Sequence, residues 1–331
     1  MPNSLNWLVI GIGDITRKRV LPAILAEPRS RLHALLTRDP RKADAYPGVE
    51  VFTVLAQALT DPAIEAVYVA SPVALHAEHA IASLRAGKHV LGEKPVAMAY
   101  AQAEMMAAAA RGATRTVGIA YYRRLYPKLV RARQLMGEGG IGRPVLVEAN
   151  FHSWLESPER GWLTDPALAG GGPLYDVGSH RIDACNYLFG KPVKAMGLLS
   201  NTLHELAVED SATTLIEYAG GVHAVVDVRW NSRIARDQFR VIGTEGEINL
   251  DMLNGPTLRV LGSDGGLREE QLPAHANVHY PVVENFVAAV LDGAPVMCPI
   301  EEGIWTDWVT ERVMRDRFLT DTSCGPNVAA P

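Results

Sequence analysis

The sequence predicts an α/β fold in two parts: a doubly wound parallel sheet, followed by an α+β domain with an open, mostly antiparallel sheet. Three observations support this. Short apolar runs alternate with helical segments in the first third of the chain, a glycine-rich turn follows the first run, and the hydrophobic period becomes two after about residue 143. Alternating strands and helices are typical of βαβ units, and a period of two is typical of a sheet with one buried face.

The first part begins with the continuous apolar run Trp7–Ile10, which suits a strand buried on both faces of a parallel sheet. Gly11, Ser71-Pro72 and Gly87 separate the segments that follow. We expect strands at Trp7–Ile10, Leu32–Leu36, Val49–Val54, Ala66–Ala70, His89–Leu91 and Thr116–Ala120, with helices at Thr16–Ala26, His76–Ala86 and Val96–Arg111.

The second part has a different period. Apolar residues occupy every second position of Val145–Phe151 and Val222–Trp230, so each of these strands should bury one face. Thr213–Tyr218 and Phe239–Ile242 are further expected strands, and Gly220-Gly221 supplies a hairpin turn.

Length and composition agree with two domains and exclude several classes of protein. The chain has 331 residues, which suits two domains of about 150 residues each. We place the boundary at residue 122, so the domains are 1–122 and 123–331, with a loosely ordered tail after Thr320. Hydrophobic residues make up 48% and charged residues 21%, which excludes wholesale disorder. A net charge of −5 gives no basic surface for nucleic acid.

We expect neither a membrane partner nor a leader segment. No apolar run approaches the ~18 residues of a membrane span, and no basic region precedes the first apolar strand. Cys185, Cys298 and Cys324 lie too far apart for a CxxC metal or redox pair. We therefore expect a cytoplasmic protein without a metal site.

The turn Gly11-Ile12-Gly13-Asp14-Ile15-Thr16 lies between the first strand and the first helix. It follows the dinucleotide fingerprint G-x-G-x-x-G/A except at Thr16, which loosens the packing of helix against strand or adds a hydroxyl donor. The glycines of this motif let a pyrophosphate approach the helix N-terminus. A purely steric need for glycine is the alternative, but the place of this turn, the first of a βαβ series, favours a phosphate site.

The end of the second strand indicates which nicotinamide cofactor is preferred. A carboxylate there binds the ribose 2′-hydroxyl of NAD, whereas an arginine accommodates the 2′-phosphate of NADP. The chain has Thr37-Arg38, with Asp39 beyond the strand tip. We therefore expect NADP(H) to be favoured, with NAD(H) as the second choice; the alternative is a solvated basic helix start.

Two further segments carry reactive side chains. Glu93-Lys94-Pro95 follows the fifth strand, so Lys94 points toward the crevice where open α/β sheets bind ligands. In segment 170–183, three glycines precede Asp176 and His180. Their i, i+4 spacing would put both on one helix face, where a carboxylate can orient an imidazole. Taken alone, an ordinary surface lysine and an ordinary helix contact would explain these residues.

Together these segments resemble the Gfo/Idh/MocA family, named after glucose–fructose oxidoreductase, inositol dehydrogenase and rhizopine catabolism. The resemblance rests on Ala70-Ser71-Pro72 with His76, and on residues 86–95, 139–144, 170–183 and 243–246. Its most specific part is Glu93-Lys94-Pro95 combined with Asp176-x-x-x-His180.

The resemblance implies a Rossmann domain, a second domain whose open sheet supports a homodimer or homotetramer, and hydride transfer between a nicotinamide cofactor and a sugar, polyol or related carbonyl compound. It implies that Lys94, Asp176 and His180 are catalytic and that the Lys94-Pro95 bond is cis. We assign cofactor binding to Gly11, Gly13, Asp14, Ile15, Thr37, Arg38, Ser71, Pro72, His76, Glu93 and Lys94. Many members have Trp-Arg where this chain has Trp162-Leu163, so one ligand contact is missing unless Arg160 replaces it.

As a mechanism, we expect His180 to take the proton of the substrate hydroxyl during oxidation, while Lys94 stabilises negative charge on that oxygen. Asp176 would orient His180 or hold a substrate hydroxyl, and Lys94 as the proton-transfer group is the alternative. We assign substrate contacts to Tyr122, Arg123, His152, Trp162, Asp176 and His180, with Tyr121, Trp154 and Asp183 as candidates whose packing role is as simple an explanation.

Three functions remain open on the sequence alone. The first is the sugar or polyol oxidoreductase, with a motif layout similar to 1,5-anhydrofructose reductases and NADP-linked sugar dehydrogenases. The second is a lyase or hydrolase that oxidises a sugar transiently with tightly held NAD⁺. The third is a non-catalytic dinucleotide sensor, against which Lys94, Asp176 and His180 argue.

Overall fold

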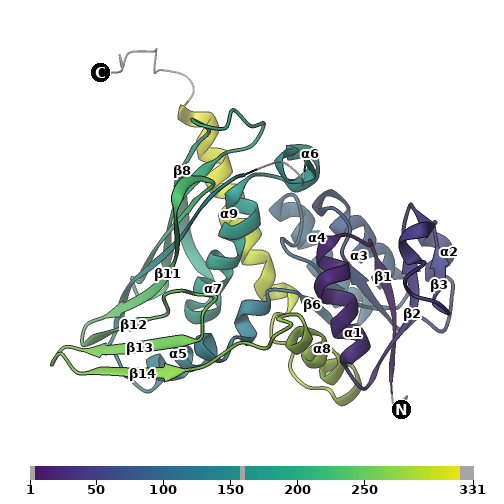
Figure 1. Ribbon diagram of the computed structural model, residues 1–331, viewed down its shortest axis with the longest axis horizontal. Helices are drawn as coiled ribbons and strands as arrows, with labels where there is room; N and C mark the ends of the chain where they lie inside the picture. The colour runs from purple at the N-terminus through teal and green to yellow at the C-terminus, as the bar shows by residue number, and fades with distance from the viewer. Residues whose placement is uncertain (1–3, 157–160, 321–331) are drawn as a thin grey trace.

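The structure is a computed structural model that describes residues 4–156 and 161–320. Figure 1 shows two sheets at opposite ends of the long axis, with helices between them. None of the described helices has the length and apolarity that crossing a membrane requires.

The first sheet is parallel throughout and has the strand order β3-β2-β1-β4-β5-β6. Its strands are β1 (Leu5–Ile10), β2 (Ser30–Leu36), β3 (Glu50–Phe52), β4 (Ala66–Val69), β5 (His89–Gly92) and β6 (Val117–Ile119). The strand order reverses between β1 and β4, so the turns that follow these two strands open onto a crevice. This arrangement confirms the predicted doubly wound sheet.

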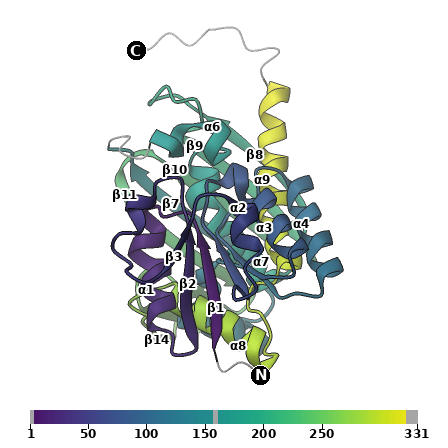
Figure 2. The same ribbon diagram turned by 90° about the vertical axis from the view of Figure 1, so that its right-hand side faces the viewer.

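Helices cover both faces of this sheet, which explains why its strands are continuous apolar runs. The helices are α1 (Leu21–Ala26), α2 (Leu55–Leu59), α3 (His76–Arg85), α4 (Tyr100–Ala113), α8 (Tyr280–Asp292) and α9 (Ile300–Thr320). One face packs against α2, α3, α4 and the start of α9, and the other against α1 and α8. In Figure 2, α1 lies on one side of the strands, and α2, α3 and α4 lie on the other.

Helix α4 begins four residues later than expected. The segment before it passes Ala97, whose N–H donates to the buried Asp307 carboxylate of α9 at 2.9 Å. This contact satisfies the backbone of the segment outside a helix, so the apolar run from Val96 does not start one.

The second sheet has eight strands in the order β14-β13-β12-β11-β7-β10-β9-β8. They are β7 (Pro144–Trp154), β8 (Pro192–Ser200), β9 (Ser211–Tyr218), β10 (His223–Arg229), β11 (Asn231–Gly243), β12 (Gly246–Asn249), β13 (Thr257–Gly262) and β14 (Leu267–Gln271). Neighbouring strands are antiparallel except β7 and β10, which confirms the mostly antiparallel prediction.

One face of the second sheet, here called the inner face, packs against α5 (Pro127–Gly137), α7 (Ser179–Phe189) and the later part of α9. Val147, Ala224 and Phe239 are fully buried there. The opposite face, the outer face, carries no helix in the ranges that the structure describes (Figure 1). The short helix α6 (Pro166–Ala169) precedes α7, and single helical turns lie at Thr16–Val20, Pro40–Ala43, Val73–Leu75, Tyr122–Leu125, Gly161–Thr164 and Leu174–Gly178.

The C-terminal segment returns to the first sheet. Phe286 of α8 is buried with its ring 5.4 Å from that of Trp7 in β1, and Pro299 forms a β-bridge with Gly118 of β6. Helix α8 and the start of α9, counted with domain 123–331 in the expected division, therefore cover the parallel sheet, because its apolar face would otherwise be exposed. The division at residue 122 stays a prediction.

Candidate active site

The turn after β1 has a backbone shape that its glycines allow. Gly11 has a φ of +90°, and a Cβ there would lie 2.5 Å from the carbonyl oxygen of Ala70, so only glycine fits. A Cβ on Gly13 would meet nothing within 4 Å, so open space lies beside the backbone. The first helical hydrogen bond runs from Arg17 N–H to Gly13 O, and the N–H groups before it lack intrahelical partners. The turn thus fits the pyrophosphate of a dinucleotide.

The remaining residues of this turn have distinct environments. Thr16 is fully buried and begins a π-helical turn, which widens the helix start around the larger side chain. Its hydroxyl is buried without a hydrogen-bond partner among the described residues. The Asp14 carboxylate accepts from Arg17 and Lys18 at 2.8 and 3.1 Å, and Ile15 is exposed.

The tip of β2 presents cations to solvent. Thr37 is buried, and its hydroxyl bonds to the backbone of Asp39. The Asp39 carboxylate accepts from Arg41 at 2.9 Å and is therefore occupied. Arg38 is exposed and forms no ion pair with a described residue. An adjacent surface hollow of about 560 Å³ is lined by Arg17, Asp39, Arg41, Lys42, Asp44, Ala45 and Tyr46.

The turns after β4 and β5 are joined by buried side chains. His76 is 3% exposed, and its ring nitrogens lie 2.8 Å from Pro95 O and 2.9 Å from Ser71 O. Burial lowers the pKa of His76, so its single N–H serves one carbonyl at a time. The neutral His76 ring therefore lies between the two turns and donates to one of these carbonyls, and its assignment to cofactor binding stays a prediction. Pro72, which begins the Val73–Leu75 turn, is partly exposed, and the Lys94-Pro95 bond is cis, as the resemblance implies.

Glu93 lies behind this loop rather than on its surface. Its carboxylate accepts from Tyr68 Oη at 2.8 Å and pairs with His279 Nε2 at 3.1 Å. Burial alone would raise the pKa of Glu93, but the hydrogen bond and charge of His279 hold it below its ordinary value. The buried carboxylate supports the backbone that carries Lys94, whose N–H it also accepts at 3.3 Å.

Lys94 meets Asp176 across the crevice. Its Nζ donates to Asp176 O at 2.8 Å and to Asp176 Oδ1 at 3.1 Å, and both side chains are partly buried. The glycine run before α7 makes this approach possible, because its backbone folds around the buried Glu209 carboxylate. Glu209 Oε1 accepts from the N–H groups of Gly172 and Leu174, and a Cβ on Gly172 would lie 2.0 Å from Glu209 O.

His180 lies near this pair but is not bonded to Asp176 in the described structure, contrary to the orienting role considered from the sequence. The Leu174–Gly178 turn is π-helical, so the i, i+4 spacing no longer stacks the two side chains as an α-helix would. His180 is 5% exposed, and its Nδ1 is buried without a partner. Burial, and after it the charges of Arg123 and Lys94, hold the pKa of His180 well below its ordinary value.

Tyr122 is the centre of the surrounding cluster. Its ring lies 4.8 Å from that of His180 and 5.2 Å from that of His279, and the Arg123 guanidinium carbon lies 4.9 Å from its centroid. Tyr121 contacts His180 edge-on at 6.1 Å. The structure thus brings Lys94, Asp176, His180, Tyr122 and Arg123 to one place.

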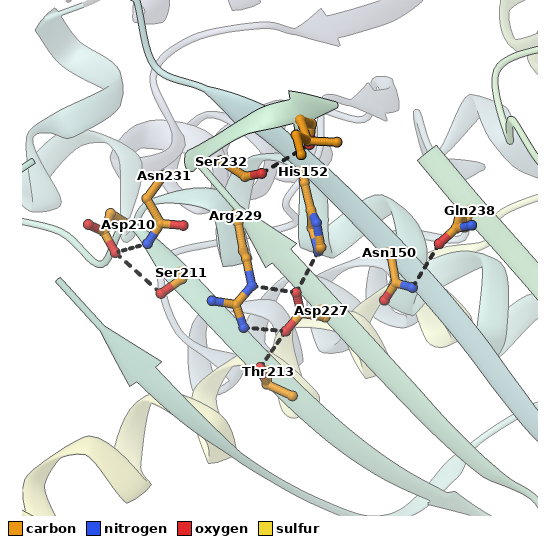
Figure 3. A network of polar contacts seen from close by, with 11 residues as sticks. Asn150, His152, Asp210, Ser211, Thr213, Asp227, Arg229, Asn231, Ser232 and Gln238 are labelled. Carbon is orange, nitrogen blue, oxygen red and sulfur yellow. Dashed lines mark hydrogen bonds and ion pairs between the residues drawn. The ribbon is translucent and has the colours of Figure 1, made fainter. Parts of the chain in front are cut away.

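Other expected substrate residues do not join this cluster. His152 lies on the outer face of the second sheet, where Nε2 pairs with Asp227 at 2.7 Å, as Figure 3 shows. Its neighbour Phe151 faces inward onto the Arg181 guanidinium, and strand alternation puts His152 on the other side. Trp154 packs against His204 and Arg233.

Two further candidate residues differ in exposure, because Trp162 is on the surface and Asp183 is buried. Trp162 is 47% exposed, next to the partly buried Leu163. Arg160, which was suggested to replace the arginine that many family members have at position 163, lies outside the described residues. Asp183 is fully buried in an ion pair with Arg124 at 2.7 Å, which is a structural role.

His279 is a buried residue of the site that sequence reasoning missed. It is 1% exposed at the N-cap of α8, far along the chain from every motif. Its one sequence signal is a polar residue just before an apolar helix, which is too common to identify a site. The link to Glu93 exists only because α8 returns to the first sheet.

Comparisons with known proteins agree with this arrangement. Residues 5–121 match the family described as "Oxidoreductase family, NAD-binding Rossmann fold", and residues 129–249 match "GFO/IDH/MocA C-terminal domain". The chain is 29% identical to 1,5-anhydro-D-fructose reductase of Ensifer adhaerens, over 91% of this chain and 92% of that one. It is 30% identical to dTDP-3,4-didehydro-2,6-dideoxy-alpha-D-glucose 3-reductase of Streptomyces violaceoruber, over 82% of this chain and 81% of that one.

A solved structure shows the same likeness in three dimensions. The aldose-aldose oxidoreductase from Caulobacter crescentus, complexed with glycerol, is 25% identical, with a TM-score of 0.85 over 94% of this chain and 97% of that one. Fold, motifs and relatives agree: the first part is an NAD(P)-binding Rossmann fold, and the chain belongs to the Gfo/Idh/MocA family of oxidoreductases.

Proposed function

We propose that this oxidoreductase transfers hydride between NADP(H) and a sugar, polyol or related carbonyl compound, with Lys94, Asp176 and His180 around the reacting oxygen. The main support is the meeting of Lys94, at the carboxyl end of β5, with Asp176 at 2.8 Å, next to the buried and unpartnered His180 Nδ1. The relatives reported above act on sugars according to their names, which supports the substrate class.

The residues divide the proton chemistry as follows. A bound nicotinamide would supply or accept the hydride. During oxidation, the neutral imidazole of His180 accepts the hydroxyl proton, because burial and neighbouring cations keep it unprotonated. Lys94 Nζ donates to the same oxygen and stabilises its negative charge. Asp176 holds the ammonium of Lys94 in place, and reduction uses the same contacts in reverse.

The preference for NADP(H) is supported by the tip of β2. Asp39, the carboxylate nearest the strand tip, is occupied by Arg41, whereas Arg38 is exposed and unpaired among the described side chains. An unpaired guanidinium suits a 2′-phosphate. NAD(H) remains the second cofactor of this proposal.

We also place a homodimer, or a homotetramer built from such dimers, on the outer face of the second sheet. Leucines that a monomer would leave in water lie there, including Leu198 at 70% and Leu215 at 47% exposure. One patch that meets its own copy about a two-fold axis buries both sets at once. The buried free thiols of Cys185 and Cys298 fit the reducing cytoplasm proposed as the compartment.

A substrate panel tests the function. Ketoses, anhydro-ketoses and inositols are incubated with NADPH or NADP⁺, and the absorbance of NADPH is followed. We expect stoichiometric cofactor turnover with at least one sugar and tighter binding of NADPH than of NADH. Product formation without net cofactor change would favour the lyase or hydrolase, and ligand binding without any turnover would favour the sensor.

A further inference from the structure

We propose that the substrate carries an anionic group, a carboxylate or a phosphate, which the guanidinium of Arg123 binds. This inference rests on the proposed oxidoreductase function and names its substrate class.

Arg123 is a buried cation that forms no ion pair with a carboxylate of the described residues. The residue is 6% exposed, and it donates from one terminal nitrogen to Tyr122 Oη at 3.0 Å and from the other to Asn254 Oδ1 at 2.9 Å. Both acceptors are neutral, and Nε–H is buried without any acceptor. No ion pair joins Arg123 to a carboxylate whose position the structure describes. A buried charge without a partner is costly, so such sites are retained where a ligand supplies the partner.

The neighbouring cations are all compensated. Arg124 pairs with Asp183 at 2.7 Å, Arg181 pairs with Asp237 at 2.6 Å, and Lys94 pairs with Asp176. Arg123 therefore differs from Arg124, the residue next to it, because no described carboxylate pairs with it and its charge is available to an anionic ligand. Arg124 pairs with Glu302 as well, and the charge of Arg123 acts on the Asp183 carboxylate, but no described carboxylate forms an ion pair with the Arg123 guanidinium.

The position of Arg123 suits a group on the same molecule that reacts at His180. The guanidinium carbon and the His180 ring lie 4.9 and 4.8 Å from the Tyr122 centroid, so they are no more than about 10 Å apart. One sugar-sized molecule spans that distance. A guanidinium can hold a carboxylate or phosphate through two parallel hydrogen bonds, which also fixes the orientation of the bound sugar.

The pyrophosphate of a dinucleotide is not the anion that this arginine would bind. Its expected place is the glycine turn after β1, whereas Arg123 follows β6, which is separated from β1 by β4 and β5. Asn254, exposed in the loop after β12, covers the guanidinium from the second domain. Arg123 thus belongs to the substrate end of the crevice.

Matched ligand pairs test the proposal. The Kd values of D-gluconate and D-glucitol, and those of D-glucose 6-phosphate and D-glucose, are measured by calorimetry on the NADPH-loaded protein. We expect the anionic member of at least one pair to bind about 10- to 100-fold more tightly, as for a hydrogen bond to a charged group. The first pair reports a carboxylate and the second a phosphate.

Variants assign the preference to Arg123. Arg123→Gln should abolish the preference, whereas Arg143→Gln, which changes an exposed arginine at a distant turn, should keep it. Asn254→Asp gives the guanidinium an internal carboxylate and should weaken the anionic ligand while leaving the neutral one unchanged. Because Asn254 is exposed, this second variant remains informative if Arg123→Gln does not fold.

Several results would overturn the proposal: no anionic ligand that binds more tightly than its neutral partner, a preference that survives Arg123→Gln, or anion binding unaffected by Asn254→Asp. None of these results would contradict the proposed function, which is tested by NADPH turnover with a carbonyl sugar. Conversely, an absence of turnover alongside tight anion binding would reject the function and keep the anion site.

Discussion

The two faces of the second sheet hold their histidines in opposite ways. His180, on the helix that packs against the inner face, is 5% exposed and has an unpartnered Nδ1. His152, on the outer face, bonds to Asp227, which is also held by Arg229 and Thr213 (Figure 3). The first imidazole has one buried ring nitrogen without a hydrogen-bond partner among the described residues, and the second is part of a hydrogen-bonded network. This difference in environment is why we propose His180, and not His152, as the acid–base group.

The largest expected difference is in kcat, when each of the two histidines is replaced by alanine. His180→Ala should lower kcat about 10²–10⁴-fold, because a positioned acid–base group is lost. His152→Ala should change kcat by no more than about threefold, since its ring lies across the sheet from the crevice. Steady-state rates at saturating cofactor and substrate measure both. Comparable losses in the two variants would contradict the assignment.

Two ion pairs, one buried and one on the outer face, should contribute differently to the free energy of unfolding. Arg124→Met leaves the buried Asp183 unpaired, so the free energy of unfolding should fall by about 3–5 kcal/mol. Arg229→Met removes a partly exposed partner of Asp227 on the outer face, and the loss should be about 0–1 kcal/mol. Urea unfolding of both variants measures the difference, and a small loss for Arg124→Met would show that water reaches the inner pair.

The association proposed for the outer face depends on its exposed leucines. Leu198→Asp should weaken self-association about 10²–10⁴-fold, because each dimer loses two apolar contacts worth about 1.5–3 kcal/mol each. The matched control is Leu25→Asp, an exposed leucine of α1 in the first domain, which should have no effect. Sedimentation velocity over a range of concentrations reports the dissociation constants. An unchanged constant for Leu198→Asp would place the interface elsewhere.

A smaller effect is expected on cofactor affinity when Arg38, at the tip of β2, is changed. Arg38→Ala should raise the Kd of NADPH about fivefold, the value of an exposed ion pair near 1 kcal/mol, and leave the Kd of NADH unchanged. Arg31→Ala, an exposed arginine near the opposite end of β2, serves as the control. Fluorescence titration distinguishes the two, and an equal effect on NADH would argue against recognition of a 2′-phosphate.

The smallest expected effect is on the pH dependence of oxidative kcat/KM. His180 must be neutral to accept a proton, and its pKa is held below the ordinary value of about 6.5. Oxidative kcat/KM should therefore stay level from neutral pH to below 6.5 and fall only as the imidazole gains a proton. A midpoint at or above pH 6.5, assigned to His180 by its loss in the alanine variant, would mean that the imidazole is not held neutral.

Local patterns predicted the fold well, since they act through near neighbours. The apolar run at Trp7–Ile10 and the alternation at Val222–Trp230 each specify how many faces of a strand are buried. The site was harder to predict. Alternation places His152 and Phe151 on opposite faces but does not say which face meets the crevice. Asp176 and His180 were expected to stack, but a π-helical turn separates them. His279 reaches Glu93 only through the tertiary return of α8.

That return also bears on how the protein is made. Trp7 emerges early during synthesis, but the Phe286 ring that packs against it is produced after most of the chain. One apolar face of the parallel sheet is therefore incompletely covered until α8, in about the last sixth of the sequence, has been synthesised. His279 comes with the same segment, so Glu93 acquires its partner at that moment. The nascent chain would thus complete its cofactor-binding half last, although it is encoded first.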